Sequence, residues 1–210
     1  MNFRALVILD AAAKVALVAL LVHAVLNPEL PQYADKAMQW RALTYPLAIA
    51  VIPLAWWFFW RSRPFPVVTD LLVTLAFLID TAGNALDLYD TIVWWDDLNH
   101  FFNWILLSAA FVALGWPRDA SRLTRVALGV GAGAVVAIIW ELFEYVTFIP
   151  DSPEAATAYR DTLGDLGLGL LGSLVGASLA AWLMDRGRLR TGRKGQGDTQ
   201  PALHLRGRVQ

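Results

Sequence analysis

The feature that most constrains this chain is a series of long apolar stretches, each long enough to cross a membrane. A membrane-spanning helix needs roughly 20 mainly apolar residues. No stretch alternates as a barrel strand would, so helices must satisfy the backbone hydrogen bonds in lipid. The sequence therefore predicts an all-α polytopic membrane protein, a bundle of about six transmembrane helices, near residues 4–26, 42–60, 66–88, 97–116, 123–148 and 163–184.

Composition excludes several other classes of protein. The 210 residues are 57% hydrophobic and only 17% charged, whereas soluble domains are about half apolar and about a quarter charged. A soluble domain of this length cannot bury so many apolar residues in one core. A soluble enzyme, a nucleic-acid-binding protein and a disordered chain are therefore poor fits. The absence of cysteine removes disulfides, zinc–thiolate sites and cysteine nucleophiles.

Basic residues predict how the spans are oriented. Arg61 and Arg63 follow the second span, Arg122 precedes the fifth, and the stretch after the sixth is also basic. Short loops rich in arginine and lysine stay in the cytoplasm. We therefore expect a multi-pass protein of the bacterial inner membrane with both termini cytoplasmic. Residues 1–186 would form the transmembrane domain and residues 187–210 a basic, disordered cytoplasmic tail.

Polar residues within four of the spans are the candidates for function, because placing a polar side chain in a membrane costs free energy. Their spacing places those of each span on one helical face. They are Asp80, Asn84 and Asp87 on the third span; Asp96, Asp97, His100 and Asn103 on the fourth; Glu141, Glu144 and Tyr145 on the fifth; and Asp161 and Asp165 on the sixth.

These polar residues are predicted to meet at one depth. The third and fifth spans run outward with polar residues near their ends, and the fourth and sixth run inward with polar residues near their starts. At a rise of about 1.5 Å per residue, Asp80 and Glu141 would lie roughly 10 Å below the outer edge. His100, Glu144 and Asp165 would lie roughly 5 Å below it. The sequence therefore predicts an outward-facing pocket of carboxylates and one imidazole.

Several carboxylates in a low-dielectric pocket cannot all stay ionised without partners. A divalent metal such as Mg, Mn, Zn or Fe suits this set of groups, and the predicted ligands are His100, Glu141, Glu144 and Asp165. One alternative is protonated or arginine-paired acids, for which Arg160 is the nearest expected cation. Another is a set of interhelical hydrogen bonds that binds no ligand.

A metal-assisted enzyme would also need a general base and groups that orient the metal ligands. The candidate bases are Asp80, Asp97 and Asp161. The candidate orienting groups are Asp96, Asn84, Asn103 and Tyr145, with Asp96 orienting His100. No residues for an organic cofactor are predicted.

Three functions remain open from the residues alone. The first is a metal-assisted enzyme acting on a lipid-like headgroup. The second is a transporter or binder of a cation, a proton or a small amphiphile. The third is a structural membrane protein without a ligand. The expected partners are the lipid bilayer and a lipid-like or cationic ligand, and no nucleic acid is expected.

Two further patterns concern helix packing. Asp10 and Lys14 are spaced to pair with each other on the first span, and Asp70 is placed to cap the third span or to approach the cytoplasmic arginines. Small residues follow Asp165 at helical spacing, which lets helices approach closely: Gly169, Gly172 and Gly176.

Three motifs together resemble the YjdF-like family of predicted bacterial inner-membrane proteins. They are Asp96-x-x-x-His100-Phe101, Glu141-Leu-Phe-Glu144-Tyr145, and Asp161-Thr162-x-x-Asp165 before a glycine-rich helix. The resemblance covers about the third to the sixth span. A looser resemblance exists to VanZ-like membrane proteins, many of which have an asparagine after the last aspartate, where this chain reads Leu166-Gly167-Leu168-Gly169. The resemblance supports the choice of residues and implies no reaction.

Overall fold

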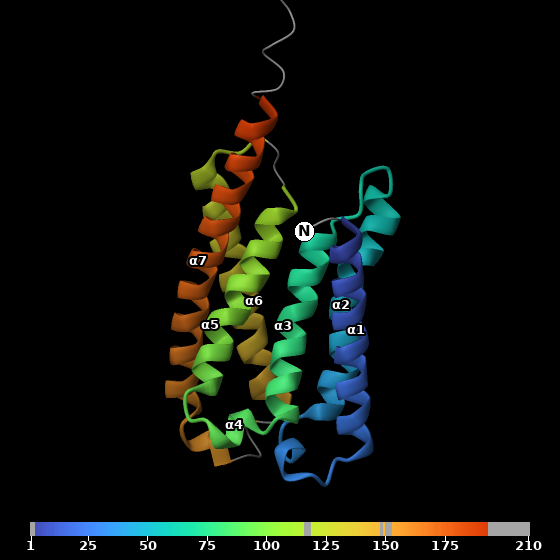
Figure 1. Ribbon diagram of the computed structural model, residues 1–210. Helices are drawn as coiled ribbons and strands as arrows, with labels where there is room; N and C mark the ends of the chain where they lie inside the picture. Colours follow the sequence, from blue (N-terminus) through green and yellow to red (C-terminus); the bar gives the residue numbers. More distant parts are fainter. Residues whose placement is uncertain (1–2, 116–118, 148, 150–152, 193–210) are drawn as a thin grey trace, which may run out of the picture.

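The computed structural model describes residues 3–115, 119–147, 149 and 153–192, and its regular structure there is helical (Figure 1). The first half contains α1 (Phe3–Leu26), a 3-10 turn (Pro31–Tyr33), α2 (Met38–Ala55), a π-helical turn that continues α2 (Trp56–Trp60) and α3 (Val67–Ala85). The second half contains the short α4 (Leu88–Thr91), α5 (Trp95–Ala113), α6 (Arg122–Thr147), a 3-10 turn (Pro153–Ala156) and α7 (Ala158–Gly192).

Five helices are long and apolar enough to cross a membrane: α1, α2 with its π-helical turn, α3, α6 and α7. The protein is therefore a multi-pass membrane protein, as predicted. α5, which corresponds to the predicted fourth span, is not among these five because its first half carries two aspartates, two asparagines and a histidine. It contacts α3, α6 and α7. Protein, rather than lipid, therefore surrounds much of its polar side.

Two helices end earlier than the sequence pattern predicts. α3 ends at Ala85, and Asp87 adopts a left-handed backbone conformation with φ of 59° before α4 begins. Asp87 therefore does not share a helical face with Asp80 and Asn84. α5 ends at Ala113 because Gly115 has φ of 68°, the conformation that glycine commonly provides just after a helix.

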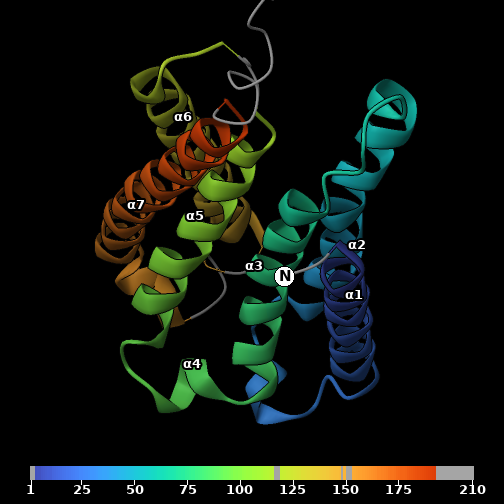
Figure 2. The same ribbon diagram turned by 45° about the horizontal axis from the view of Figure 1, so that its top comes forward.

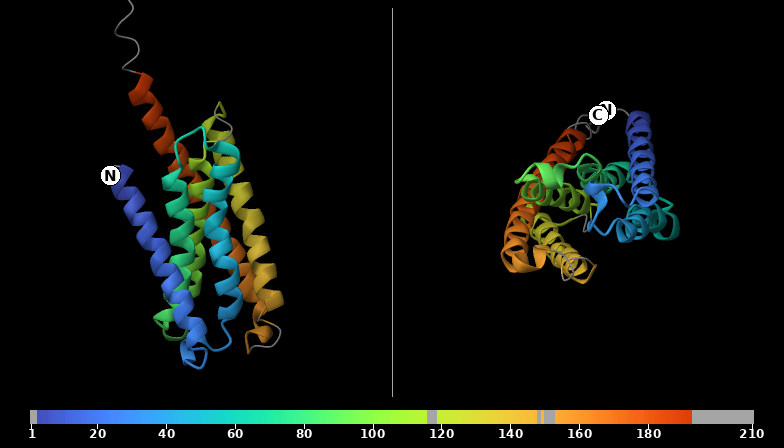
Figure 3. Two further views of the ribbon diagram at one scale, coloured as in Figure 1. Left: turned by 90° about the vertical axis from the view of Figure 1, so that its right-hand side faces the viewer. Right: turned by 90° about the horizontal axis from the view of Figure 1, so that it is seen from below.

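The helices form two groups of three. Figure 2 shows α1, α2 and α3 on one side and α5, α6 and α7 on the other, with contact between α3 and α5 joining the groups. Figures 1 and 3 show that α1 begins and α7 ends at the same end of the bundle, opposite α4. α7 continues to Gly192. The first residues of the predicted tail are therefore helical, and residues 193–210 lie outside the described residues.

Glycines on α7 bring its backbone against α5, as predicted. A Cβ atom added at Gly172 would overlap the carbonyl oxygen of Phe101, and one added at Gly176 would overlap the backbone of Ile105. Both glycines are buried. This contact holds α7, and with it the buried Asp165, against the helix that carries the histidine.

A buried group of charges joins α1 to α3 in the half of the bundle where α1 begins. Lys14 Nζ lies 3.0 Å from Asp10 Oδ2 and also pairs with Asp70 Oδ2. The predicted pairing of Asp10 with Lys14 is confirmed. Asp70 does not cap α3, because the N-cap residue of that helix is Pro66. Its side chain pairs with Lys14 instead of with the arginines.

We expect Lys14→Met to lower the free energy of unfolding by about 2 kcal/mol. Removing the cation leaves two buried carboxylates together, and the effect is moderated because Lys14 is partly exposed. Unfolding of detergent-solubilised protein by a denaturing detergent measures it. Lys36→Met is the control, since Lys36 pairs with the exposed Asp90 at 2.7 Å, and its cost should stay below about 1 kcal/mol. Equal stability of Lys14→Met and wild type would contradict the expectation.

Candidate functional site

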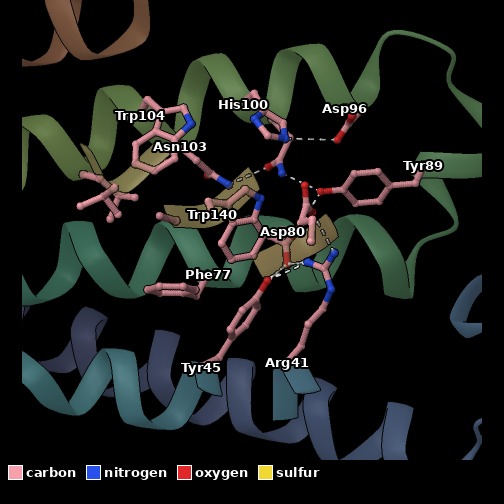
Figure 4. A pocket seen from close by; sticks show the side chains of 15 residues that line it. Arg41, Tyr45, Phe77, Asp80, Tyr89, Asp96, His100, Asn103, Trp104 and Trp140 are labelled. Carbon is pink, nitrogen blue, oxygen red and sulfur yellow. Dashed lines mark hydrogen bonds and ion pairs between the residues drawn. The ribbon is translucent and has the colours of Figure 1, made fainter. Parts of the chain in front are cut away.

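The centre of the candidate site is a buried ion pair between α2 and α3. Arg41, in the first turn of α2, is 5% exposed. Its Nη1 donates to Asp80 Oδ2 at 2.5 Å and to the Tyr45 hydroxyl at 2.7 Å. Tyr45 in turn donates to the same Asp80 oxygen at 2.6 Å. Figure 4 shows the three side chains converging from the two helices.

The second oxygen of Asp80 begins a chain of polar groups that leads to α5. The Tyr89 hydroxyl donates to Asp80 Oδ1 at 2.8 Å, and Asn99 Nδ2 donates to that hydroxyl at 2.6 Å. Asn103 Nδ2 continues the chain to Asn99 Oδ1 at 3.0 Å. Burial and the neighbouring Asp80 carboxylate raise the pKa of Tyr89, on α4, well above its ordinary value. Tyr89 therefore remains a proton donor to Asp80.

A second cluster surrounds His100 on α5. Its Nε2 lies 3.7 Å from Asp96 Oδ1. Its Nδ1 lies 3.8 Å from both Glu141 Oε1 on α6 and Asp165 Oδ1 on α7. These separations are too long for hydrogen bonds, and the buried Nδ1 has no hydrogen-bond partner. Glu144 links the two clusters, because its Oε1 lies 3.6 Å from Arg41 Nη2.

The His100 cluster fits a divalent metal. Two groups of three residues each bring one ligand atom per residue within 4.8 Å of one another. They are Asp96, His100 and Asp165, and His100, Glu141 and Glu144. Two ligand atoms that are each about 2.1 Å from one ion lie at most about 4.2 Å apart. The 3.8 Å separations between Nδ1 and the two carboxylate oxygens fall within that limit. Imidazole with carboxylates is a donor set that suits Zn, Fe or Mn.

The predicted convergence of polar residues at one end of the bundle is therefore what the structure shows. It brings together predicted residues from four helices: Asp80, Asp96, His100, Asn103, Glu141, Glu144 and Asp165. A cavity of about 80 Å³ between the helices reaches both clusters, and its lining includes Arg41, His100 and Glu144. It has room for about three waters, since each takes about 30 Å³ in the liquid.

Other predicted residues take different positions. Asp97 and Asp161 are exposed, although their charges act on His100. Tyr145 is 57% exposed and does not join the cluster. Asn84 is buried, and its side chain donates to the backbone carbonyl of Asp80 rather than to a metal ligand.

Sequence reasoning missed Arg41, the cation at the centre of the site. The second span was predicted to begin at residue 42, so Arg41 was read as part of a loop. The available signal was its i, i+4 spacing to Tyr45 at the same end of the bundle as the acidic residues. Arg160, the cation predicted to be nearest to the acids, is instead exposed. The polar, tyrosine and tryptophan side chains of the site that the pattern did not predict are Arg41, Tyr45, Tyr89, Asn99, Trp104 and Trp140.

Comparison with curated proteins gives no match, and comparison with solved structures gives none either. One family model matches residues 9–186, a stretch that contains most of α1 and of α7 and all the helices between them. This match does not name the YjdF-like or VanZ-like proteins, so those finer resemblances stay predictions. On the length of this match, the chain belongs to the family described as predicted membrane protein, DUF2238.

Proposed function

We propose that this protein is a metal-dependent membrane enzyme that acts on the polar end of a lipid-like substrate. The observation that carries the proposal is the buried His100 Nδ1, which faces two carboxylate oxygens at 3.8 Å and has no hydrogen-bond partner. A buried polar atom without a partner is costly and needs an explanation. A cation between the three groups supplies one.

The ligands in this proposal are His100, Glu141, Glu144 and Asp165, with Asp96 beside Nε2 of the histidine. A bound divalent ion would polarise a substrate oxygen or lower the pKa of a water molecule. Asp96 would orient the imidazole so that Nδ1 points to the other ligands. Arg41, 3.6 Å from Glu144, would hold that carboxylate in place.

The surroundings of the three candidate bases favour two of them. Both oxygens of Asp80 accept hydrogen bonds, one of them from Arg41, so Asp80 serves best as the group that positions Arg41 and Tyr45. Asp97 and Asp161 are exposed at the edge of the cluster. A base there can exchange its proton with water after each turnover, which favours Asp97 or Asp161 for that role.

We further propose that the cluster faces outward from a bacterial inner membrane, with both termini in the cytoplasm. The support is the distribution of arginine in short loops. It is consistent with α1 beginning and α7 ending on one side of the bundle (Figure 1).

The test is the metal content of detergent-purified protein, measured by mass spectrometry for wild type, His100→Ala and Glu141→Gln. We expect near-stoichiometric Zn, Fe, Mn or Mg in the wild type. Each substitution removes a ligand and should lower the metal content at least about tenfold, since loss of a supporting partner alone costs 10- to 100-fold in affinity. Thermal melting of each variant shows whether it remains folded.

His23→Ala is the matched control. His23 lies near the end of α1, and its Nδ1 is 3.0 Å from the Tyr33 hydroxyl, outside the cluster. Its metal content should equal that of the wild type. A folded wild type that takes up no metal from supplemented medium, or a His100→Ala variant that keeps its metal, would refute the proposal. Stability loss in Glu141→Gln without any bound metal in wild type would favour the purely structural function.

The second candidate is transport of a cation or proton, and the Asp10–Lys14–Asp70 group favours it. This group places buried carboxylates in the other half of the bundle, away from the His100 cluster. Intramembrane ionisable groups at two depths are a feature of ion and proton pathways. Gradient-driven uptake into proteoliposomes that is lost in Asp70→Asn, together with metal-free wild type, would select this function instead.

A further inference from the structure

An apolar groove runs between the two groups of helices. It has a volume of about 410 Å³, and its walls come from α2, α3, α5 and α6. Ala48 and Val51 line it from α2, Leu107 and Phe111 from α5, and Val136 from α6. Val51 is 56% exposed and Val136 46% exposed, although both belong to helices that cross the membrane. Hydrocarbon is therefore the medium that meets these walls.

The groove adjoins the polar cavity at one end. Phe77, Trp104 and Val136 line both. At its other end, Phe111 and Leu114 also line a hollow of about 550 Å³ beside the π-helical turn. Adjacent apolar hollows therefore extend from the side of the polar cavity toward the opposite end of the bundle.

A further hollow lies beside the cavity, between α2 and α6. This hollow of about 200 Å³ shares Tyr45, Phe77 and Trp140 with the cavity. Ile139, on its wall, is 57% exposed. The cavity is therefore bordered on this side by apolar side chains that the bilayer can reach, and this is the side from which a membrane-dissolved molecule would approach the polar groups.

Size and charge define the polar end that the cavity accepts. A volume of about 80 Å³ suits a compact group. In the metal-free protein, Arg41 supplies one positive charge against the carboxylates of Asp80, Asp96 and Glu144, so the lining residues by themselves carry an excess of formal negative charge. An anionic end would be repelled there, whereas a hydroxyl or an ammonium group would find hydrogen-bond acceptors.

We infer that the groove holds the hydrocarbon chain of a membrane amphiphile and that the cavity holds its compact, uncharged or cationic polar end. The inference rests on the proposed function in one respect, since it makes this amphiphile the substrate that meets the His100 cluster. The groove and the cavity themselves are independent of any metal.

The experiment is photolabelling of the full chain in detergent with a long-chain alcohol that carries a diazirine in the middle of its chain. Peptide mass spectrometry then maps the labelled residues. We expect label on the groove walls of α2 and α5, around Ala48, Val51 and Leu107. Val136→Trp fills the junction of groove and cavity and should reduce this label about fivefold or more, the effect expected of an overpacked site.

Val135→Trp is the matched control, because Val135 is 57% exposed and does not line the groove. It should keep the wild-type labelling. Ala48→Trp, with Leu47→Trp as its control, repeats the test from α2 in case Val136→Trp fails to fold. In protein that has been stripped of metal by a chelator, a long-chain amine should compete with the label better than a long-chain phosphate does.

Label confined to outward faces such as Leu47, or unchanged by both groove substitutions, would overturn the inference. Equal competition by the phosphate would overturn its charge assignment. Metal content separates this result from the proposed function. If the protein binds metal but the groove is not labelled, only the amphiphile inference is rejected. If the groove is labelled but no metal is bound, only the proposed metal-dependent enzyme is rejected.

Discussion

Arg41→Met is expected to lower the free energy of unfolding by about 3–5 kcal/mol, the cost of removing one partner from a buried ion pair. Arg41 is 5% exposed and its partner Asp80 4% exposed. Without the guanidinium, the Asp80 carboxylate would stay buried with two tyrosine donors and no cation. Unfolding in detergent by a denaturing detergent measures the loss.

Two variants show whether the loss comes from the unpaired charge. Arg41→Met combined with Asp80→Leu removes both charges of this pair and should recover part of the stability, as apolar replacement of buried pairs often does. The recovery is incomplete because Glu144 still loses the guanidinium that lies 3.6 Å away. Arg122→Met removes an arginine that is largely exposed and lies 2.6 Å from Asp185, so it should cost less than about 1 kcal/mol. A cost for Arg41→Met as small as that for Arg122→Met would show that the buried pair contributes little.

Gly176→Leu is expected to destabilise the protein by about 3 kcal/mol or more, the upper range for overpacked interiors. A side chain at Gly176 would overlap the backbone of Ile105, and a backbone cannot rotate aside as a flexible side chain can. α5 and α7 would have to separate. Since His100 lies on α5 and Asp165 on α7, the variant should also lose bound metal.

Gly167→Leu is the matched control on the same helix. A Cβ added at Gly167 meets no atom within 4 Å, so its stability and metal content should remain close to those of the wild type. Thermal melting and metal analysis measure both variants. If Gly176→Leu has the same melting temperature as Gly167→Leu, the close approach of α5 and α7 does not hold the site together.

The position of the polar residues along their helices was predictable. His100, Glu141 and Asp165 come from three helices that alternate in direction, and their distance from each helix end is set by the rise of about 1.5 Å per residue. The structure places the carboxylates of Glu141 and Asp165 beside the imidazole of His100. The same reasoning could not find Arg41, because it lies at the edge of an apolar stretch, where an arginine is ordinarily solvated.

The rotation of each helix about its axis was less predictable. Tyr145 directly follows Glu144 and was expected in the same cluster, but it is 57% exposed. Successive residues on a helix point about 100° apart, so only contacts with neighbouring helices decide which of them faces inward. Asp87 differs for another reason, since α3 ends at Ala85 and its backbone turns away.

By itself, the sequence determined that the chain is a helical membrane protein and that His100, Glu141 and Asp165 lie toward the same end of the bundle. Apolar length and helical rise are local properties, so one chain is enough to read them. Only the tertiary structure decided that Arg41 pairs with Asp80, that Lys14 pairs with Asp70, and that a groove lies between α2 and α6. These contacts depend on which helices are neighbours and on how each helix is rotated about its axis. Both are set by the free energy of packing side chains from distant parts of the chain.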